Sequence, residues 1–90
     1  MDFLLYIILL FSNNVETQKG RVIDHEMNDP LTFVMVTSSI DTTYTNLNGE
    51  YKIKYHKNDS LTFRFVGYES VKLSPKKYEV IELEQLSLDF

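Results

Sequence analysis

The side chains that could perform catalysis are few and lie far apart along the chain. The two histidines, His25 and His56, fall in separate stretches of turn-forming residues, so no i, i+4 pair and no H-E-x-x-H motif can hold zinc. We interpret each as a solvated turn residue. Ser38, Ser39 and Ser60 have no nearby base and no nucleophile-elbow motif, and the chain has no cysteine to supply a thiolate. We therefore expect no catalytic residue and no zinc site.

An acidic loop is the remaining candidate for a metal site. Asp24, Glu26 and Asp29 offer the hard oxygen ligands that calcium prefers. The alternative, which we favour, is a turn in which the aspartate side chains accept hydrogen bonds from their own backbone. The stretch YTNLNG resembles part of an EF-hand loop, but Tyr44 takes the first ligand position and Tyr55 the place of the bidentate glutamate. We expect neither a metal nor another cofactor.

Charge and aromatic content narrow the possible partners. The net charge is −4, and the lysines and arginines are scattered along the sequence, so no basic patch for nucleic acid or a membrane surface is visible. Most of the six tyrosines and six phenylalanines occupy positions that should face a core. Tyr44 and Tyr78 are the exceptions, and these two rings could line a surface.

The N-terminal residues differ from the rest of the chain. Phe3–Phe11 is a run of nine apolar residues, too short for a membrane span of about 20 residues but suited to the apolar region of a secretory signal. Asp2 replaces the usual positive charge, and no A-x-A cleavage site is visible. A buried strand or a misassigned start codon is the alternative. We expect residues 1–18 to be a signal peptide and linker, with no lipid-anchoring cysteine.

Residues after Lys19 alternate with a period of two, and no window of eleven or more residues shows a helical stripe. Asn48-Gly49 is the strongest hairpin signal, because both residues tolerate positive φ. In the fourth expected strand Tyr51, Ile53 and Tyr55 share one face and two lysines the other. The pattern predicts seven short strands, at 20–24, 31–39, 42–46, 51–55, 60–65, 70–74 and 79–85.

The stretch NDSLTFRFVGYESVKL has a glycine where its strand ends. We expect Leu61, Phe63 and Phe65 to face the core. Gly67 should allow a bend or a positive φ, because it carries no Cβ. Tyr68 should then lay its ring over the edge of the core, with its hydroxyl reaching polar partners.

Seven short strands with one apolar face each must pack face to face to bury those faces. We predict an all-β fold, a seven-stranded antiparallel β-sandwich of the transthyretin-like, Greek-key kind, over a small closed barrel. Charged residues on the outward face of most strands agree with sheets that are half solvated.

The ordered set of motifs resembles the carboxypeptidase regulatory-like domain, which has a transthyretin-like sandwich. The stretches that carry the resemblance are GRVIDHEMNDPLTFVMV, TTYTNLNGEYKIKY and DSLTFRFVGYES, and together they span about residues 19–84. SSIDTT and NLNG depart from the family pattern but keep its turn chemistry. The resemblance implies a sandwich at 19–86 followed by a tail at 87–90. The residues that we take as its structural motif are Gly20, Asp24, Pro30, Leu31, Asn48, Gly49, Gly67 and Tyr68.

Such domains are non-catalytic accessory modules, found beside zinc carboxypeptidases or at the N-terminus of TonB-dependent outer-membrane receptors after the signal peptide. The resemblance therefore implies an exported module of the periplasm or outer membrane, either free-standing or joined to downstream receptor domains. A protein partner is expected, with no nucleic acid and no membrane span in the mature chain. The alternative is a structural or adhesive sandwich that associates through an edge strand formed by residues 79–90.

Overall fold

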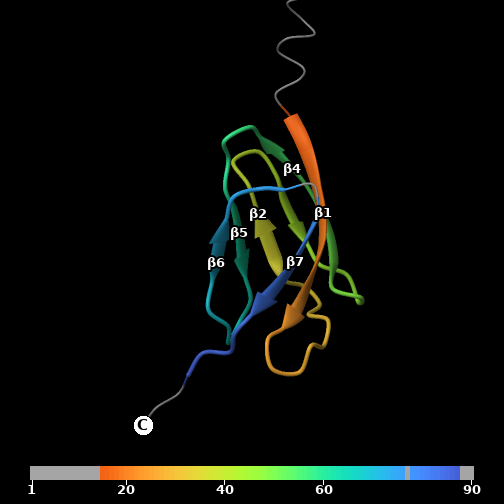
Figure 1. The fold of residues 1–90 in the computed structure, drawn as a ribbon, viewed down its shortest axis with the longest axis vertical. Helices are drawn as coiled ribbons and strands as arrows, with labels where there is room; N and C mark the ends of the chain where they lie inside the picture. The colour runs from red at the N-terminus through yellow and green to blue at the C-terminus, as the bar shows by residue number, and fades with distance from the viewer. Residues whose placement is uncertain (1–14, 77, 88–90) are drawn as a thin grey trace, which may run out of the picture.

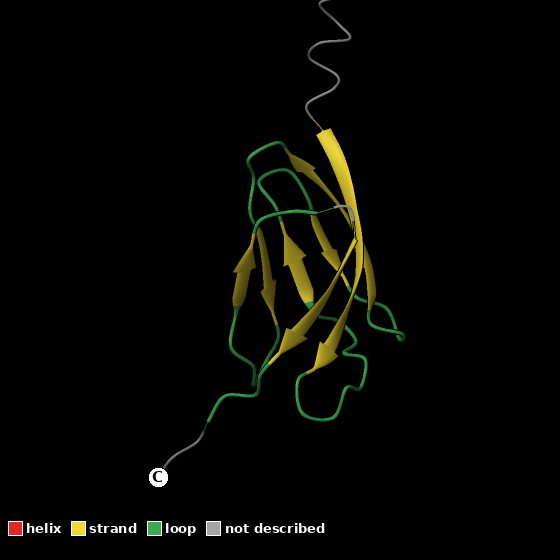
Figure 2. Ribbon diagram, viewed as in Figure 1, coloured by secondary structure: helices red, strands yellow, loops and turns green. Residues whose placement is uncertain are grey.

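In the computed structural model, residues 15–76 and 78–87 are described, and they form seven strands in two sheets (Figures 1 and 2). One sheet has three strands in the order β4-β1-β7, and the other has four in the order β3-β2-β5-β6. The predicted seven-stranded sandwich is confirmed, and the two separate sheets exclude the barrel. The strands are β1 (Val15–Asp24), β2 (Met35–Thr37), β3 (Thr42–Tyr44), β4 (Glu50–His56), β5 (Leu61–Arg64), β6 (Val71–Leu73) and β7 (Tyr78–Leu83).

The core lies between the two sheets and is built from the inward positions of the alternating strands. Phe63 of β5 is fully buried and packs edge-to-face on Tyr51 of β4, with ring centroids 5.4 Å apart. The predicted inward positions of β4, β5 and β7 are confirmed, and Phe65, just beyond β5, packs half-buried against the same cluster. The buried core residues are Val22, Val34, Val36, Tyr51, Ile53, Tyr55, Leu61, Phe63, Ile81 and Leu83.

The first strand begins earlier than predicted. We expected a strand at 20–24 after a polar linker, but β1 already pairs with β4 from Val15, opposite His56. The polar composition of residues 15–18 favoured a linker. In the structure Gln18 faces inward, is buried, and donates a hydrogen bond to the Tyr51 hydroxyl, so its amide is satisfied within the fold. The apolar run Phe3–Phe11 lies outside the described residues.

The second strand is much shorter than the predicted 31–39. Phe33 adopts a left-handed φ of 65°, which breaks the extended backbone before β2. Backbone bonds from Phe33 N to Thr45 O and from Thr45 N to Val34 O remain there. The buried Thr45 hydroxyl adds to them, since it donates to Leu31 O and accepts from Val34 N at 3.0 Å. Residues 31–34 therefore lie outside β2, although their β-branched and aromatic composition predicts a strand, because the left-handed φ at Phe33 interrupts it.

The predicted turn at Asn48-Gly49 is present, but it does not join two strands of one sheet. Gly49 has φ of 75° and donates its N–H to Asn46 O at 2.9 Å. The strands on either side, β3 and β4, then part into different sheets. This turn therefore connects the two layers of the sandwich, where we expected a simple hairpin.

One strand pair is parallel, whereas we predicted antiparallel sheets throughout. β7 runs alongside β1 in the same direction, from Lys19 opposite Tyr78 to Asp24 opposite Leu83. The chain crosses from β6 in one sheet to β7 in the other (Figure 1). Because of this crossover, β7 starts at the same end of its sheet as residues 19–24 of β1, and the two segments run in the same direction. Strand direction here follows from that crossover, which alternation within a strand does not encode.

Candidate functional site

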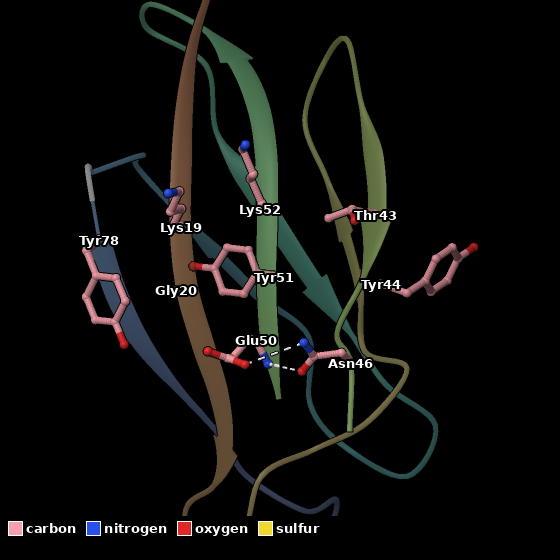
Figure 3. Close-up of a pocket in the computed structure, with 9 residues that line it drawn as sticks. All are labelled: Lys19, Gly20, Thr43, Tyr44, Asn46, Glu50, Tyr51, Lys52 and Tyr78. Carbon is pink, nitrogen blue, oxygen red and sulfur yellow. Dashed lines mark hydrogen bonds between the residues drawn. The ribbon is translucent and has the colours of Figure 1, made fainter. Parts of the chain in front are cut away.

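A shallow, open depression crosses the outer side of the β1–β4 pair and reaches the edge of β3 (Figure 3). Figure 3 shows Tyr78 at one end and Tyr44 at the other, with β4 between them. Both rings are exposed, at 61% and 55%, so the expectation that these two tyrosines lie on the surface is confirmed. The residues that line the depression are Lys19, Gly20, Thr43, Tyr44, Asn46, Glu50, Tyr51, Lys52 and Tyr78.

Strand register determines which charges meet at the depression. Lys19 of β1 lies directly opposite Lys52 of β4 and also opposite Tyr78 of β7. Two residues further along β1, Arg21 lies opposite Glu50. These side chains share the solvent-facing side of the sheet because successive residues of a strand point to opposite faces. Cations scattered in the sequence are thus gathered on one face.

The floor of the depression depends on the missing side chain of Gly20. A Cβ there would lie 2.2 Å from Glu79 O and 2.4 Å from the Tyr51 hydroxyl oxygen. The Tyr51 ring passes under this glycine, and its hydroxyl accepts a hydrogen bond from Gln18 Nε2 at 2.8 Å. Burial raises the pKa of Tyr51, so the hydroxyl stays neutral at ordinary pH.

The edge of β4 is held at both ends by turn residues. Asn46 Oδ1 accepts the N–H groups of Asn48 and Glu50, both at 2.9 Å. At the other end of the strand, Lys54 N donates to Asp41 Oδ2 at 3.0 Å, and Lys54 O accepts the Ser38 hydroxyl. β4 is therefore fixed against the β2–β3 and β3–β4 connections, which keeps the depression in a defined shape.

Asp24 is the centre of a second polar cluster, at the end of β1. Its Oδ2 accepts the backbone N–H groups of Glu26 and Met27, and its Oδ1 accepts the Tyr68 hydroxyl at 2.8 Å. The bond from Met27 N–H and then that from Tyr68 lower the pKa of Asp24. The turn interpretation of this acidic loop is confirmed, because both carboxylate oxygens bind within the protein.

The other residues of the predicted structural motif gather around this same end. Leu31 N donates to Val22 O, and Pro30 forms an isolated bridge with Ile23. A Cβ on Gly49 would lie 2.5 Å from Val22 O, so a larger residue would push the turn off β1. The backbone carbonyl of Asn48 accepts a hydrogen bond from Arg21 Nε–H.

The Gly67-Tyr68 corner matches the prediction from the sequence. Gly67 has φ of 84°, and its carbonyl accepts the N–H of Leu86. Tyr68 packs half-buried against the core and against Phe65, with ring centroids 5.5 Å apart. Gly20 is the one motif residue placed elsewhere, at the depression.

His25 is exposed as expected but is ion-paired, which the sequence did not indicate. Its Nδ1 lies 3.0 Å from Glu82 Oε2, and its Nε2 lies 3.6 Å from Glu84 Oε1. The hydrogen bond with Glu82 and the charge of Glu84 raise the pKa of His25. His56 ends β4, and its N–H lies 3.3 Å from Asp59 Oδ2. Within residues 15–76 and 78–87, no three histidine, aspartate or glutamate side chains are arranged to hold a metal ion.

Sequence reasoning missed several residues of the depression. Lys19, Lys52 and Asn46 were not identified as site residues from the sequence, because their meeting depends on how the strands pair. The alternation of lysines with Tyr51 and Ile53 was a usable signal, since it placed both β4 lysines on the outer face. The described part of the chain contains no helix long and apolar enough to cross a membrane.

A comparison with known protein families gives a match. The family model of the CarboxypepD_reg-like domain matches residues 18–89. Among curated proteins no match is found.

Proposed function

The chain belongs to the CarboxypepD_reg-like domain family, and from this premise we propose that it is an exported, non-catalytic module that acts by contacting another protein. Carboxypeptidase regulatory-like domains form a family of non-catalytic β-sandwich modules, and the fold agrees with that description. In the cell envelope the module would serve as the N-terminal domain of a TonB-dependent receptor or as a free-standing relative. Its partner is then the downstream receptor domains or a separate protein.

The depression is the observation that carries the contact role. Two exposed tyrosine rings flank a pair of lysines on a face that strand pairing and fixed turns hold in place. Exposed tyrosine rings on a preorganised surface are typical of protein-binding sites, and the lysines between them select for an anionic partner. Support for export comes from the apolar run Phe3–Phe11, whose length suits a secretory signal.

Cell fractionation tests the export part of the proposal. The full chain with a C-terminal tag should be recovered from the periplasm or outer membrane, shortened at its N-terminus. Ile8→Arg, which interrupts the apolar run, should leave the chain in the cytoplasm, whereas Asn14→Arg in the polar stretch should not. Intact mass spectrometry reads the N-terminus. A cytoplasmic chain that keeps Met1 would refute export.

Edge-strand association is a second candidate, favoured by the position of β7 at the edge of the three-stranded sheet. Its Tyr78 and Val80 side chains are exposed there. The inward-pointing Glu79 opposes it, because an inward charge on an edge strand discourages pairing with another chain. Light scattering coupled to size-exclusion chromatography measures the oligomeric state of the unmodified chain and of Glu79→Val. The Glu79→Val variant should promote association through β7. A strict monomer for both proteins counts against this candidate.

A further inference from the structure

Cations are concentrated on the outer side of the β1–β4 pair, although the chain as a whole is acidic. Four of its nine lysines and arginines lie there, and we call these four residues the cationic face. Glu50 is the carboxylate that register places among them, opposite Arg21. An exposed positive surface on a chain of net charge −4 attracts anionic partners and repels cationic ones. The cationic face consists of Lys19, Arg21, Lys52 and Lys54.

These cations are not neutralised within the part of the chain that the structure describes. The ion pairs there involve His25 and Lys76, not the cationic face. Arg21 uses its Nε–H on a backbone carbonyl. Lys19 and Lys52 stand directly opposite each other, and like charges in that position destabilise a sheet. A carboxylate from a partner, placed between the two ammonium groups, would relieve this repulsion.

The backbone of β4 offers a binding edge at the same place. The N–H and C=O groups of Glu50 and Lys54 point away from β1 and are bonded to turn residues. The backbone groups of successive strand residues point alternately toward and away from the neighbouring strand. The N–H and C=O of Lys52, midway between Glu50 and Lys54, therefore also point away from β1, into the depression. The carboxylate of Asp41 lies nearby but accepts the N–H groups of Thr42 and Lys54, so it does not compete for Lys52.

We propose that this face binds an extended acidic segment of a partner protein, with carboxylates at alternate positions. Alternate residues of an extended chain lie about 6.7 Å apart, which is also the spacing of Lys52 and Lys54 along β4. The segment would pair with the backbone of Lys52 and set its carboxylates over the lysines. Tyr44, on β3 beside this edge of β4, would contact its uncharged residues (Figure 3). This inference rests on the proposed contact role and names the chemistry of the partner.

The test uses the purified chain and a fluorescein-labelled peptide in which glutamate alternates with threonine. A second peptide has the same composition with its glutamates in one block. Anisotropy should show binding of the alternating peptide that weakens as salt rises through about 0.1 M, where screening acts over about 10 Å. The double variant Lys19→Glu with Lys52→Glu should bind the alternating peptide about tenfold more weakly or worse, as expected for two lost ion pairs.

The matched control is Arg64→Glu with Lys72→Glu, which makes the same charge change on β5 and β6 of the other sheet. This variant should bind the alternating peptide within about twofold of the unmodified chain, because its cations lie away from the depression. Equal loss in both variants would mean that only net charge matters, and would overturn the proposal. So would equal binding of the two peptides.

A binding assay with vesicles that contain phosphatidylglycerol distinguishes a protein partner from an anionic lipid surface as the ligand of the cationic face. Binding to vesicles without binding to the alternating peptide would overturn the proposal in favour of lipid. The peptide assay uses purified protein and is independent of localisation. A negative peptide result with correct export therefore refutes this inference alone, whereas a cytoplasmic chain refutes the proposed export alone.

Discussion

Replacing Gly20 by alanine should be among the most damaging small substitutions in this domain. The added Cβ would lie 2.2 Å from Glu79 O, 2.4 Å from the Tyr51 hydroxyl oxygen and 2.6 Å from Tyr51 Cζ, where ordinary contact is 3.4–4 Å. The first of these atoms belongs to the backbone of β7, which is paired with β1 at that position. β7 and the Tyr51 ring must therefore both move by about 1 Å or more to make room.

The expected cost follows from these contacts. Overpacking of a well-packed site costs about 1–3 kcal/mol. Displacing the Tyr51 ring also breaks the hydrogen bond from Gln18, which adds about 1 kcal/mol. Together we expect a loss of about 3 kcal/mol, out of a total of roughly 5–15 kcal/mol for a native domain. For a domain of this size that loss lowers Tm by roughly 12–24 °C.

Urea and thermal denaturation followed by circular dichroism and tyrosine fluorescence measure this loss, since the chain has six tyrosines and no tryptophan. Gly67→Ala is the matched control: a Cβ there meets nothing within 4 Å, so only its left-handed φ of 84° costs energy, about 1–2 kcal/mol. A double-mutant cycle with Tyr51→Leu should show less than additive loss, because the smaller side chain relieves the clash. The reasoning fails if Gly20→Ala melts no lower than Gly67→Ala.

Three further predictions concern charge and pH. Lys19→Glu should raise the free energy of unfolding by about 0.2–1 kcal/mol, measured in urea, because it turns a repulsive pair with Lys52 into an attractive one; an unchanged midpoint would contradict this. The pKa of His25 is raised in the folded protein, so its ion pairs stabilise the fold fully at a pH below 6.5, the pKa of the unfolded state. This stabilisation is lost as the pH rises through the pKa of the folded state. His25→Gln should remove that fall in Tm above pH 6.5, and an identical pH profile would disprove it. Tyr68→Phe removes a donor to Asp24, so the pKa of that carboxyl should move up toward 3.8 and stability should be lost at a higher pH during acidification; an NMR titration of the carboxyl carbon checks it.

Local pattern was enough to predict most of the strands and the corner at Gly67. Alternation assigned Tyr51, Ile53 and Phe63 to the core, because side chains on successive strand residues point to opposite faces. The positive φ at Gly49 and Gly67 was also foreseeable, since glycine is the residue that adopts it without strain. These features depend on neighbours a few residues away, which the sequence displays directly.

What needed the tertiary structure was every feature that joins distant segments. Strand partners depend on how the sheets pack, so the parallel β1–β7 pair and the parting of β3 from β4 were not visible in alternation. The same holds for the depression. Alternation in the sequence placed Lys52 on the solvent-facing side of its strand, whereas Lys19 lies just before the first predicted strand. The β1–β4 register decided that these two lysines face each other, and the crossover to β7 set Tyr78 beside them. Gly20 was placed in a motif by its sequence, but only the ring of Tyr51 beneath it explains why no side chain fits there.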